Sequence, residues 1–335
     1  MHRRHASAAT SHMHWCATAS KKWPPSACHW APKFQASSRP ALASFSKSSS
    51  KLFGGIMSFA DQAGQDEGRY FGTSYTGQYR GEDGGDVAHE AVLRLAQTGS
   101  PEVDVKAMSA RRVAAVLVLL HLSSDGTLAV LLTQRSKHLK SHPGDTALPG
   151  GRVEPSDQTV ISTALREANE EIGLPLDDQS HYAYLATLEP FVSRNLLIVY
   201  PVVYAYTQPI EVLMAKLVPS QDEVAQIFCL PLKSVLDASN QAQPGKLTHS
   251  SKDFRWIEGN VYRWHSFENN DIPSPLAGLT ADIILAVAGI AYKVQEPLFG
   301  PINAPGQANL RDFVQWVLAG KGGEQNDEFS LIRSK

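Results

Sequence analysis

Three glutamates lie close together between Gly150 and Leu174, and their spacing could place them on one side of a helix. Glu167 and Glu171 are four residues apart, and Glu170 is three residues from Glu167. All three lie near the C-terminal end of the predicted helix, where its dipole disfavours each negative charge by roughly 0.3–1 kcal/mol. Arg166 can reach Glu170, but one guanidinium cannot neutralise three carboxylates. A divalent cation held by oxygen ligands and water, Mg²⁺ or Mn²⁺, would complete the charge balance. The alternative is a solvated acidic surface.

The helix that would carry these glutamates is predicted from Gln158 to Ile172. Its apolar residues fall within one stripe, which is expected to pack on a sheet: Ile161, Ala164, Leu165, Ala168 and Ile172. Asp157 is predicted to cap the N-terminus of this helix, and Gly173 suits the left-handed residue that follows its last turn.

The rest of the folded region alternates between strand-like and helix-like patterns. Strands are expected at 113–121, 128–133, 182–190, 196–206 and 224–230, and helices at 86–95, 279–292 and 310–317. Asp86 is the expected N-cap of the first helix, and Gly99 is expected to close it. Asp125 and Gly126 form a hairpin signal, so the first two strands should be antiparallel. We therefore predict an α/β fold of the α+β kind, with a mixed β-sheet packed by helices.

Four regions are predicted along the chain: a basic transit peptide or disordered arm at 1–56, a linker at 57–85, a folded domain at 86–320 and a polar tail at 321–335. The first 60 residues contain no Asp or Glu but carry eight Lys and Arg, a composition typical of organellar transit peptides. A true start at Met57 is an alternative. Because the C-terminal residues are not a Ser-Lys-Leu peroxisomal address, we expect a mitochondrial location, with the peroxisome as the alternative.

The composition favours a soluble enzyme without a disulfide framework. Hydrophobic residues make up 43% of the chain and charged residues 19%, and the net charge of −2 gives no argument for binding nucleic acid. The longest apolar runs are too short to span a bilayer. The three cysteines are an odd number, and two of them, Cys16 and Cys28, lie in the basic arm. The composition does not indicate an oligomeric state.

The nine residues from Arg166 to Leu174 resemble the second half of the Nudix box, G-x5-E-x7-R-E-U-x-E-E-x-G-U. Upstream the chain departs from this signature, because the stretch from Gly151 to Arg166 is one residue longer and has no Glu at the first acidic position. Asp157 is the nearest acid. The run from Glu154 to Asp157 resembles the coenzyme A diphosphatase branch of the family, in which the Gly-Gly pair is followed by an acid-Pro-x-Asp run.

A second motif of the same branch, L-L-T-x-R-[SA]-x3-R-x3-G-x3-F-P-G-G, matches at every spacing from Leu131 to Gly151. Two identities differ, with Lys140 in place of Arg and Leu148 in place of Phe. So many fixed positions at fixed spacing make this a specific motif. The resemblance extends over residues 111–292, and it implies a Nudix fold with this range as its core.

The resemblance implies metal-dependent hydrolysis of coenzyme A or acyl-coenzyme A to 3′,5′-ADP and (acyl-)4′-phosphopantetheine. In that reading Glu167 and Glu171 hold the metal, Glu170 is a further ligand or a base, and Arg166 orients the carboxylates. Glu223 is a candidate general base, although simple solvent exposure is equally compatible with its position. The implied substrate-binding residues are Arg135, Lys140, Gly150 and Gly151. Two alternatives remain: a Nudix diphosphatase of NADH or ADP-ribose, and an inactive nucleotide-binding module.

Overall fold

An eight-stranded mixed sheet forms the centre of the fold in the computed structural model, which describes residues 84–101, 103, 112–177, 179–320 and 330–331. Its main path runs β3-β2-β1-β7-β5. Outside this path, β4 pairs with β1, β8 pairs with β2 and β6 pairs with β7. β1 (Val113–Leu122) is antiparallel to β2 (Leu128–Arg135) and parallel to β7 (Ile198–Tyr206). The remaining strands of this sheet are β3 (Thr146–Ala147), β4 (Gly150–Arg152), β5 (Tyr182–Thr187), β6 (Phe191–Val192) and β8 (Val224–Pro231).

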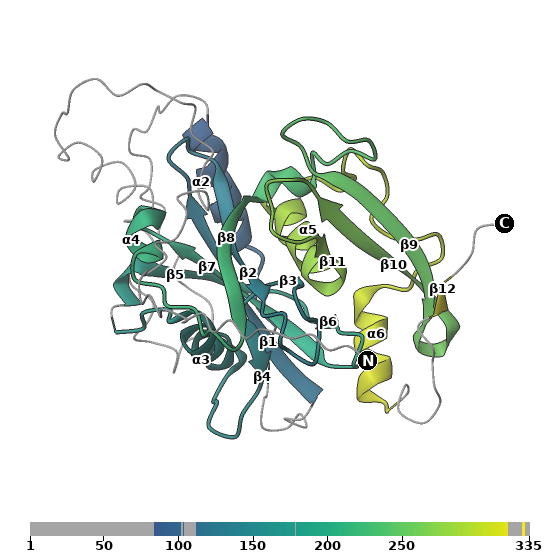
Figure 1. Ribbon diagram of the computed structural model, residues 1–335. Coiled ribbons are helices and arrows are strands. Elements are labelled where there is room, and N and C mark those ends of the chain that lie inside the picture. Colours follow the sequence, from purple (N-terminus) through teal and green to yellow (C-terminus); the bar gives the residue numbers. More distant parts are fainter. Residues whose placement is uncertain (1–83, 102, 104–111, 178, 321–329, 332–335) are drawn as a thin grey trace, which may run out of the picture. The chain divides into compact units, whose positions relative to one another are not determined.

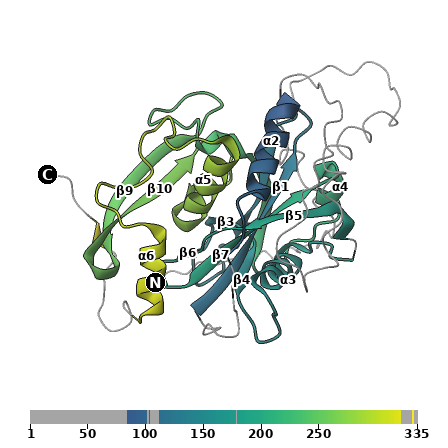
Figure 2. The ribbon, with the colours of Figure 1, turned by 180° about the vertical axis from the view of Figure 1, so that it is seen from behind.

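Helices pack on both faces of this sheet. The side chains of β1 alternate between two cores: Leu117 and Leu119 pack in the core that α3 (Val160–Ile172) covers, and Val118 and Leu120 pack in the core beneath α2 (Gly84–Ala96) and α5 (Gly278–Tyr292). Figures 1 and 2 show α3 and α5 on opposite sides of the strands. The predicted mixed sheet sandwiched between helices is confirmed.

A second sheet, which the sequence did not predict, follows the first. It has the order β11-β10-β9-β12 and consists of β9 (Thr248–Trp256), β10 (Asn260–Glu268), β11 (Leu276–Ala277) and β12 (Ser330–Leu331). The short helices are α4 (Ile210–Met214) and the 3-10 turns η2 (Gln179–His181), η3 (Leu232–Val235) and η4 (Ile257–Gly259). The predicted C-terminal helix is present as α6 (Leu310–Leu318), beside the second sheet in Figure 1.

The ends of α3 are set by local hydrogen bonds, one of which differs from the prediction. Thr159 is the N-cap, because its side chain accepts the backbone N–H of Ser162 and the Ser162 hydroxyl closes a capping box. The predicted cap at Asp157 is therefore wrong; its carboxylate binds Arg166 instead. Gly173 adopts φ 64° and ψ 33° after the last turn, which confirms its predicted left-handed role.

The start of α2 also differs from its prediction. The helix begins at Gly84, so Asp86 lies inside it and is not the N-cap. The whole predicted arm, the predicted linker up to residue 83, and most of the predicted polar tail lie outside the described residues. None of the helices among the described residues is long and apolar enough to cross a membrane.

Candidate active site

Two adjacent glycines bring β4 against both β1 and α3. Gly150 pairs with Val116 of β1, and a Cβ at Gly150 would lie 2.4 Å from the carbonyl oxygen of Ala115. A Cβ at Gly151 would lie 2.3 Å from Oε1 of Glu167. Gly150 therefore requires glycine for a close approach to backbone, whereas a Cβ at Gly151 would displace the end of the Glu167 side chain.

The predicted carboxylates Glu167 and Glu171 both reach this glycine pair. The backbone N–H of Gly150 donates to Oε2 of Glu171 at 3.2 Å, while the Glu167 carboxylate lies against Gly151. We call Glu167 and Glu171 the carboxylate pair. The four-residue spacing thus places the two side chains together, as the sequence predicted.

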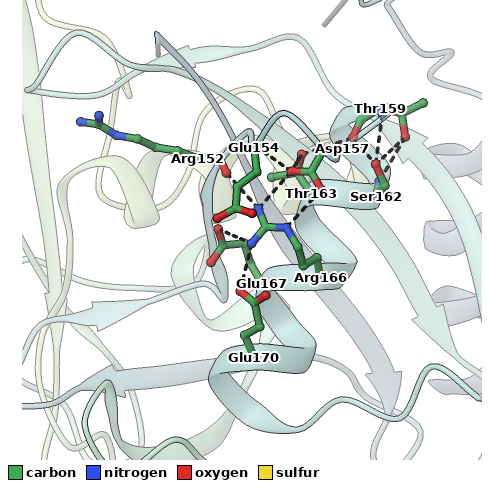
Figure 3. Close-up of polar contacts among 9 residues, drawn as sticks. All are labelled: Arg152, Glu154, Asp157, Thr159, Ser162, Thr163, Arg166, Glu167 and Glu170. Atoms are coloured by element: carbon green, nitrogen blue, oxygen red, sulfur yellow. Dashed lines mark hydrogen bonds and ion pairs between the residues drawn. The ribbon is translucent and has the colours of Figure 1, made fainter. Parts of the chain in front are cut away.

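Arg166 connects several acids around this pair. Its guanidinium donates to Oδ1 and Oδ2 of Asp157 at 3.1 and 3.0 Å and to Oε2 of Glu170 at 2.9 Å, and it lies 3.1 Å from Oε1 of Glu167. Nη2 also donates to the carbonyl of Arg152 at 3.0 Å. Figure 3 shows the guanidinium between Asp157 on one side and Glu167 and Glu170 on the other. The hydrogen bonds with Asp157 are the largest cause that raises the pKa of Arg166.

Asp157 is a buried partner of Arg166, a role that the sequence analysis missed. Its side chain is only 4% exposed, and it also accepts the Thr163 hydroxyl and the backbone N–H of Glu154, each at 2.9 Å. Burial by itself would raise the pKa of Asp157, but the bonds from Arg166, Glu154 and Thr163 together lower it below its usual value. Asp157 is thus the acid that pairs with Arg166 in a chain that lacks the first Glu of the box.

The pKa values of both members of the carboxylate pair are raised, mainly because the two side chains are buried. Burial raises the pKa of Glu171 to about 7; the Gly150 N–H opposes this rise, and the charge of Glu167 adds to it. Burial also raises the pKa of Glu167, although Arg166 counteracts the shift and the charges of Glu170 and Glu223 increase it. Two neighbouring carboxylates with raised pKa values form an all-oxygen donor set that suits a hard divalent cation.

Within the described part of the chain, no three His, Cys, Asp or Glu side chains come close enough to form a complete metal cage. Mg²⁺ commonly uses only one or two carboxylates together with water and substrate phosphate, so a pair fits it. The Glu170 side chain is 55% exposed and bonds to Arg166. Its assignment as a metal ligand or base stays a prediction.

The structure brings two further predicted residues next to the carboxylate pair. Antiparallel pairing of β2 with β8 sets Arg135 opposite Val224, and the backbone N–H of Ser136 donates to the carbonyl of Glu223 at 2.8 Å. The charge of Glu223 raises the pKa of Glu171, and that of Arg135 lowers it. Among the described residues, the buried Nε of Arg135 has no hydrogen-bond partner.

Lys140 lies in the loop between β2 and β3. We call this loop, residues 136–145, the substrate loop, after the substrate-binding role predicted for Lys140. Lys140 is exposed, and no described contact joins it to the glutamates. His142 in the same loop has a positive φ of 52° and pairs with Asp145 at 3.1 Å. The substrate-binding role of Lys140 remains a prediction.

Comparison with known proteins identifies the family. The NUDIX domain family matches residues 111–250. The chain is 36% identical over 182 residues to Nudix hydrolase 15, mitochondrial, of Arabidopsis thaliana, which covers 54% of this chain and 59% of that protein. It is 34% identical over 176 residues to the peroxisomal coenzyme A diphosphatase ndx-8 of Caenorhabditis elegans, which covers 52% of this chain and 67% of that protein.

A third relative is matched over nearly its whole length. The uncharacterized Nudix hydrolase NudL of Yersinia pestis (strain Pestoides F) is 36% identical over 216 residues, which cover 64% of this chain and 95% of that protein. By contrast, the chain spans less than two thirds of the length of the Arabidopsis relative. The glycine pair, the carboxylate pair and these matches lead to one conclusion: the chain belongs to the Nudix hydrolase family.

Proposed function

We propose that this protein is a divalent-metal-dependent diphosphatase that hydrolyses coenzyme A and acyl-coenzyme A to 3′,5′-ADP and (acyl-)4′-phosphopantetheine. The observation that carries the proposal is the carboxylate pair, Glu167 and Glu171, held against Gly150 and Gly151 with raised pKa values. Such a pair is stabilised when a cation binds between it and an anionic substrate.

The residues around the pair have separate roles in this proposal. A divalent cation at Glu167 and Glu171 would polarise a phosphoryl oxygen and lower the pKa of bound water. Arg166, itself fixed by Asp157, holds the Glu167 carboxylate in one orientation. Glu223 is the proposed general base, because it is an exposed carboxylate directly before β8 and its charge raises the pKa of both members of the pair.

Two observations support coenzyme A as the substrate, and a third supports a phosphate-containing substrate in general. The motif from Leu131 to Gly151 resembles the coenzyme A diphosphatase branch at every spacing. One relative carries that activity in its name. A buried N–H without a partner is rare in proteins, and a phosphate oxygen would satisfy the Nε of Arg135. Lys140, in the substrate loop, would then meet a second phosphate of the substrate.

A substrate comparison tests this proposal. Purified protein is assayed with Mg²⁺ or Mn²⁺ against coenzyme A, NADH and ADP-ribose, and we expect kcat/KM to be at least about tenfold higher for coenzyme A. Equal or faster turnover of NADH or ADP-ribose would assign a different substrate. Absence of turnover with all three would favour a nucleotide-binding module without activity.

A pair of variants tests the metal site. Glu171→Gln keeps the shape of the side chain and removes its charge, so we expect kcat to fall by about 10²-fold or more. Its thermal stability should not fall, because the amide replaces a buried carboxylate whose pKa is already raised. Glu189→Gln, at an exposed ion pair with Arg311, is the matched control and should keep wild-type turnover. Unchanged turnover in Glu171→Gln would contradict the metal assignment.

The proposed location is the mitochondrion, with the peroxisome as the alternative. The basic composition of residues 1–56 supports a mitochondrial transit peptide. The relatives include one protein named as mitochondrial and one named as peroxisomal. Imaging of the chain with and without residues 1–56 distinguishes the two, since loss of mitochondrial signal on deletion is expected only for a transit peptide.

A further inference from the structure

The connection between β10 and β11 touches the first sheet at the end of the substrate loop. We call residues 269–276, which end at the first residue of β11, the connecting segment. The hydroxyl of Thr146 donates to the Ser274 carbonyl at 2.9 Å and lies 2.8 Å from the Ser274 hydroxyl. Nε2 of Gln134 donates to the Pro273 carbonyl and to the Gly144 carbonyl, each at 3.3 Å. Figure 1 shows β11 next to β3, and the two strands are in contact.

The two side chains join the connecting segment to opposite ends of the substrate loop. Gln134 immediately precedes Arg135 on β2, and Thr146 immediately follows the loop on β3. Gly144, which Gln134 contacts, is a loop residue with a left-handed backbone at φ 78°. The loop base is also closed by the Arg135 N–H, which donates to the Asp145 carbonyl at 2.9 Å. A backbone hydrogen bond thus closes the base of the substrate loop, and the side chains of Gln134 and Thr146 bind this base to the connecting segment.

The connecting segment is itself well fixed. Oδ1 of Asn269 accepts the backbone N–H groups of Asp271 and Ile272 at 3.0 and 3.2 Å, which holds the turn after β10. At the other end Leu276 is fully buried and pairs with Phe267 of β10. A segment anchored at both ends provides fixed carbonyl groups for Gln134 and Thr146.

We propose that Gln134 and Thr146 are positioning residues that hold the substrate loop, and with it Arg135 and Lys140, in the orientation that binds substrate phosphate. This inference rests on the proposed function. The connecting segment lies outside the range 111–250 that the NUDIX domain family matches. A part of the chain beyond the family domain would therefore set the affinity for the substrate.

The predicted consequence is a change in substrate affinity and not in the chemical step. The carboxylate pair does not contact Gln134 or Thr146 through any described hydrogen bond, so kcat should stay within about twofold of wild type. Thr146→Val removes the hydroxyl and keeps the shape, and Gln134→Leu removes the amide donor. Thr146→Val should raise KM for coenzyme A by roughly two- to tenfold, the range that one lost hydrogen bond corresponds to, and Gln134→Leu, which removes two hydrogen bonds, should raise it by at least as much. Thr146→Ser keeps the hydroxyl, so its KM for coenzyme A should stay at the wild-type value.

Thr207→Val is the matched control. Thr207 is also a buried threonine, and its hydroxyl donates to the His181 carbonyl at 3.2 Å on a different part of the sheet. The variant Thr207→Val should lower the thermal unfolding midpoint about as much as Thr146→Val does, but it should leave KM unchanged. Hydrogen exchange adds a second readout that needs no substrate. Amides of residues 137–144 should exchange faster in Thr146→Val and Gln134→Leu than in wild type or Thr207→Val.

The outcomes separate this inference from the proposed function. If coenzyme A is not cleaved by wild type, the proposed function fails, and KM is measured instead with whichever diphosphate is cleaved. Faster exchange of the loop together with a raised KM supports the positioning role. Unchanged exchange in both variants overturns it, as does faster exchange without any change in KM. A KM in Thr146→Ser as high as that in Thr146→Val would also overturn the positioning role.

Discussion

Replacement of Gly151 by alanine should lower the rate by around 10²-fold without unfolding the protein. The new Cβ would lie 2.3 Å from Oε1 and 2.4 Å from Cδ of Glu167, whereas ordinary contacts begin at 3.4 Å. The carboxylate must therefore retreat by about 1 Å, a displacement that typically costs around 10²-fold in rate when it affects a reacting group. The obstacle is the end of a flexible side chain, so the free energy of unfolding should change by less than about 1 kcal/mol.

Gly150→Ala is the control because its obstacle is backbone. The Cβ would lie 2.4 Å from the Ala115 carbonyl oxygen and 2.6 Å from Cα of Val116, both in β1. Such crowding in a packed sheet should cost about 1–3 kcal/mol or more. Initial rates with coenzyme A and thermal unfolding midpoints are measured for both variants. Wild-type turnover in Gly151→Ala would refute the placement of Glu167, and so would a loss of stability equal to that of Gly150→Ala.

Three further predictions concern Arg166, pH and metal. Asp157→Asn removes the charge that fixes Arg166, so kcat/KM should fall roughly tenfold to a hundredfold; unchanged kinetics would show that Arg166 needs no such partner. Burial lowers the pKa of both His121 and His249 to about 4 in the folded state, against 6.5 when exposed. The unfolded chain therefore binds protons first as pH falls from 6.5 towards 4, so both imidazoles should lower the stability over that window, and the almost fully buried His121 should cost up to about 3 kcal/mol. Denaturant unfolding at pH 7.5 and 5 measures this loss, and equal midpoints would contradict it. Chelation by EDTA should abolish coenzyme A cleavage and added Mg²⁺ or Mn²⁺ should restore it; activity that persists in EDTA would exclude the metal role.

The elements that carry the site could be predicted because their signals are local. The stripe on α3, the left-handed Gly173 and the hairpin turn at Gly126 depend on residues a few positions apart, and each is present as expected. Asp157 was misassigned because its real partner, Arg166, is nine residues away and Thr159 competes locally for the cap. Side-chain type alone does not decide between two such roles.

The second sheet could not be predicted from side-chain patterns. β9 contains the consecutive polar residues Ser250, Ser251, Lys252 and Asp253, which break any apolar alternation. Its hydrogen bonds come from backbone pairing with β10 and do not depend on those side chains. The closeness of Arg135 and Glu223 likewise results from the pairing of β2 with β8, which is set by the tertiary fold.

The identity of the products is the most direct test of the central claim. Purified protein is incubated with acetyl-coenzyme A and Mg²⁺, and the mixture is analysed by mass spectrometry. Attack at the diphosphate should give equal amounts of 3′,5′-ADP and acetyl-4′-phosphopantetheine. Intact acetyl-coenzyme A, or release of inorganic phosphate from the 3′ position with the diphosphate preserved, would contradict the assignment.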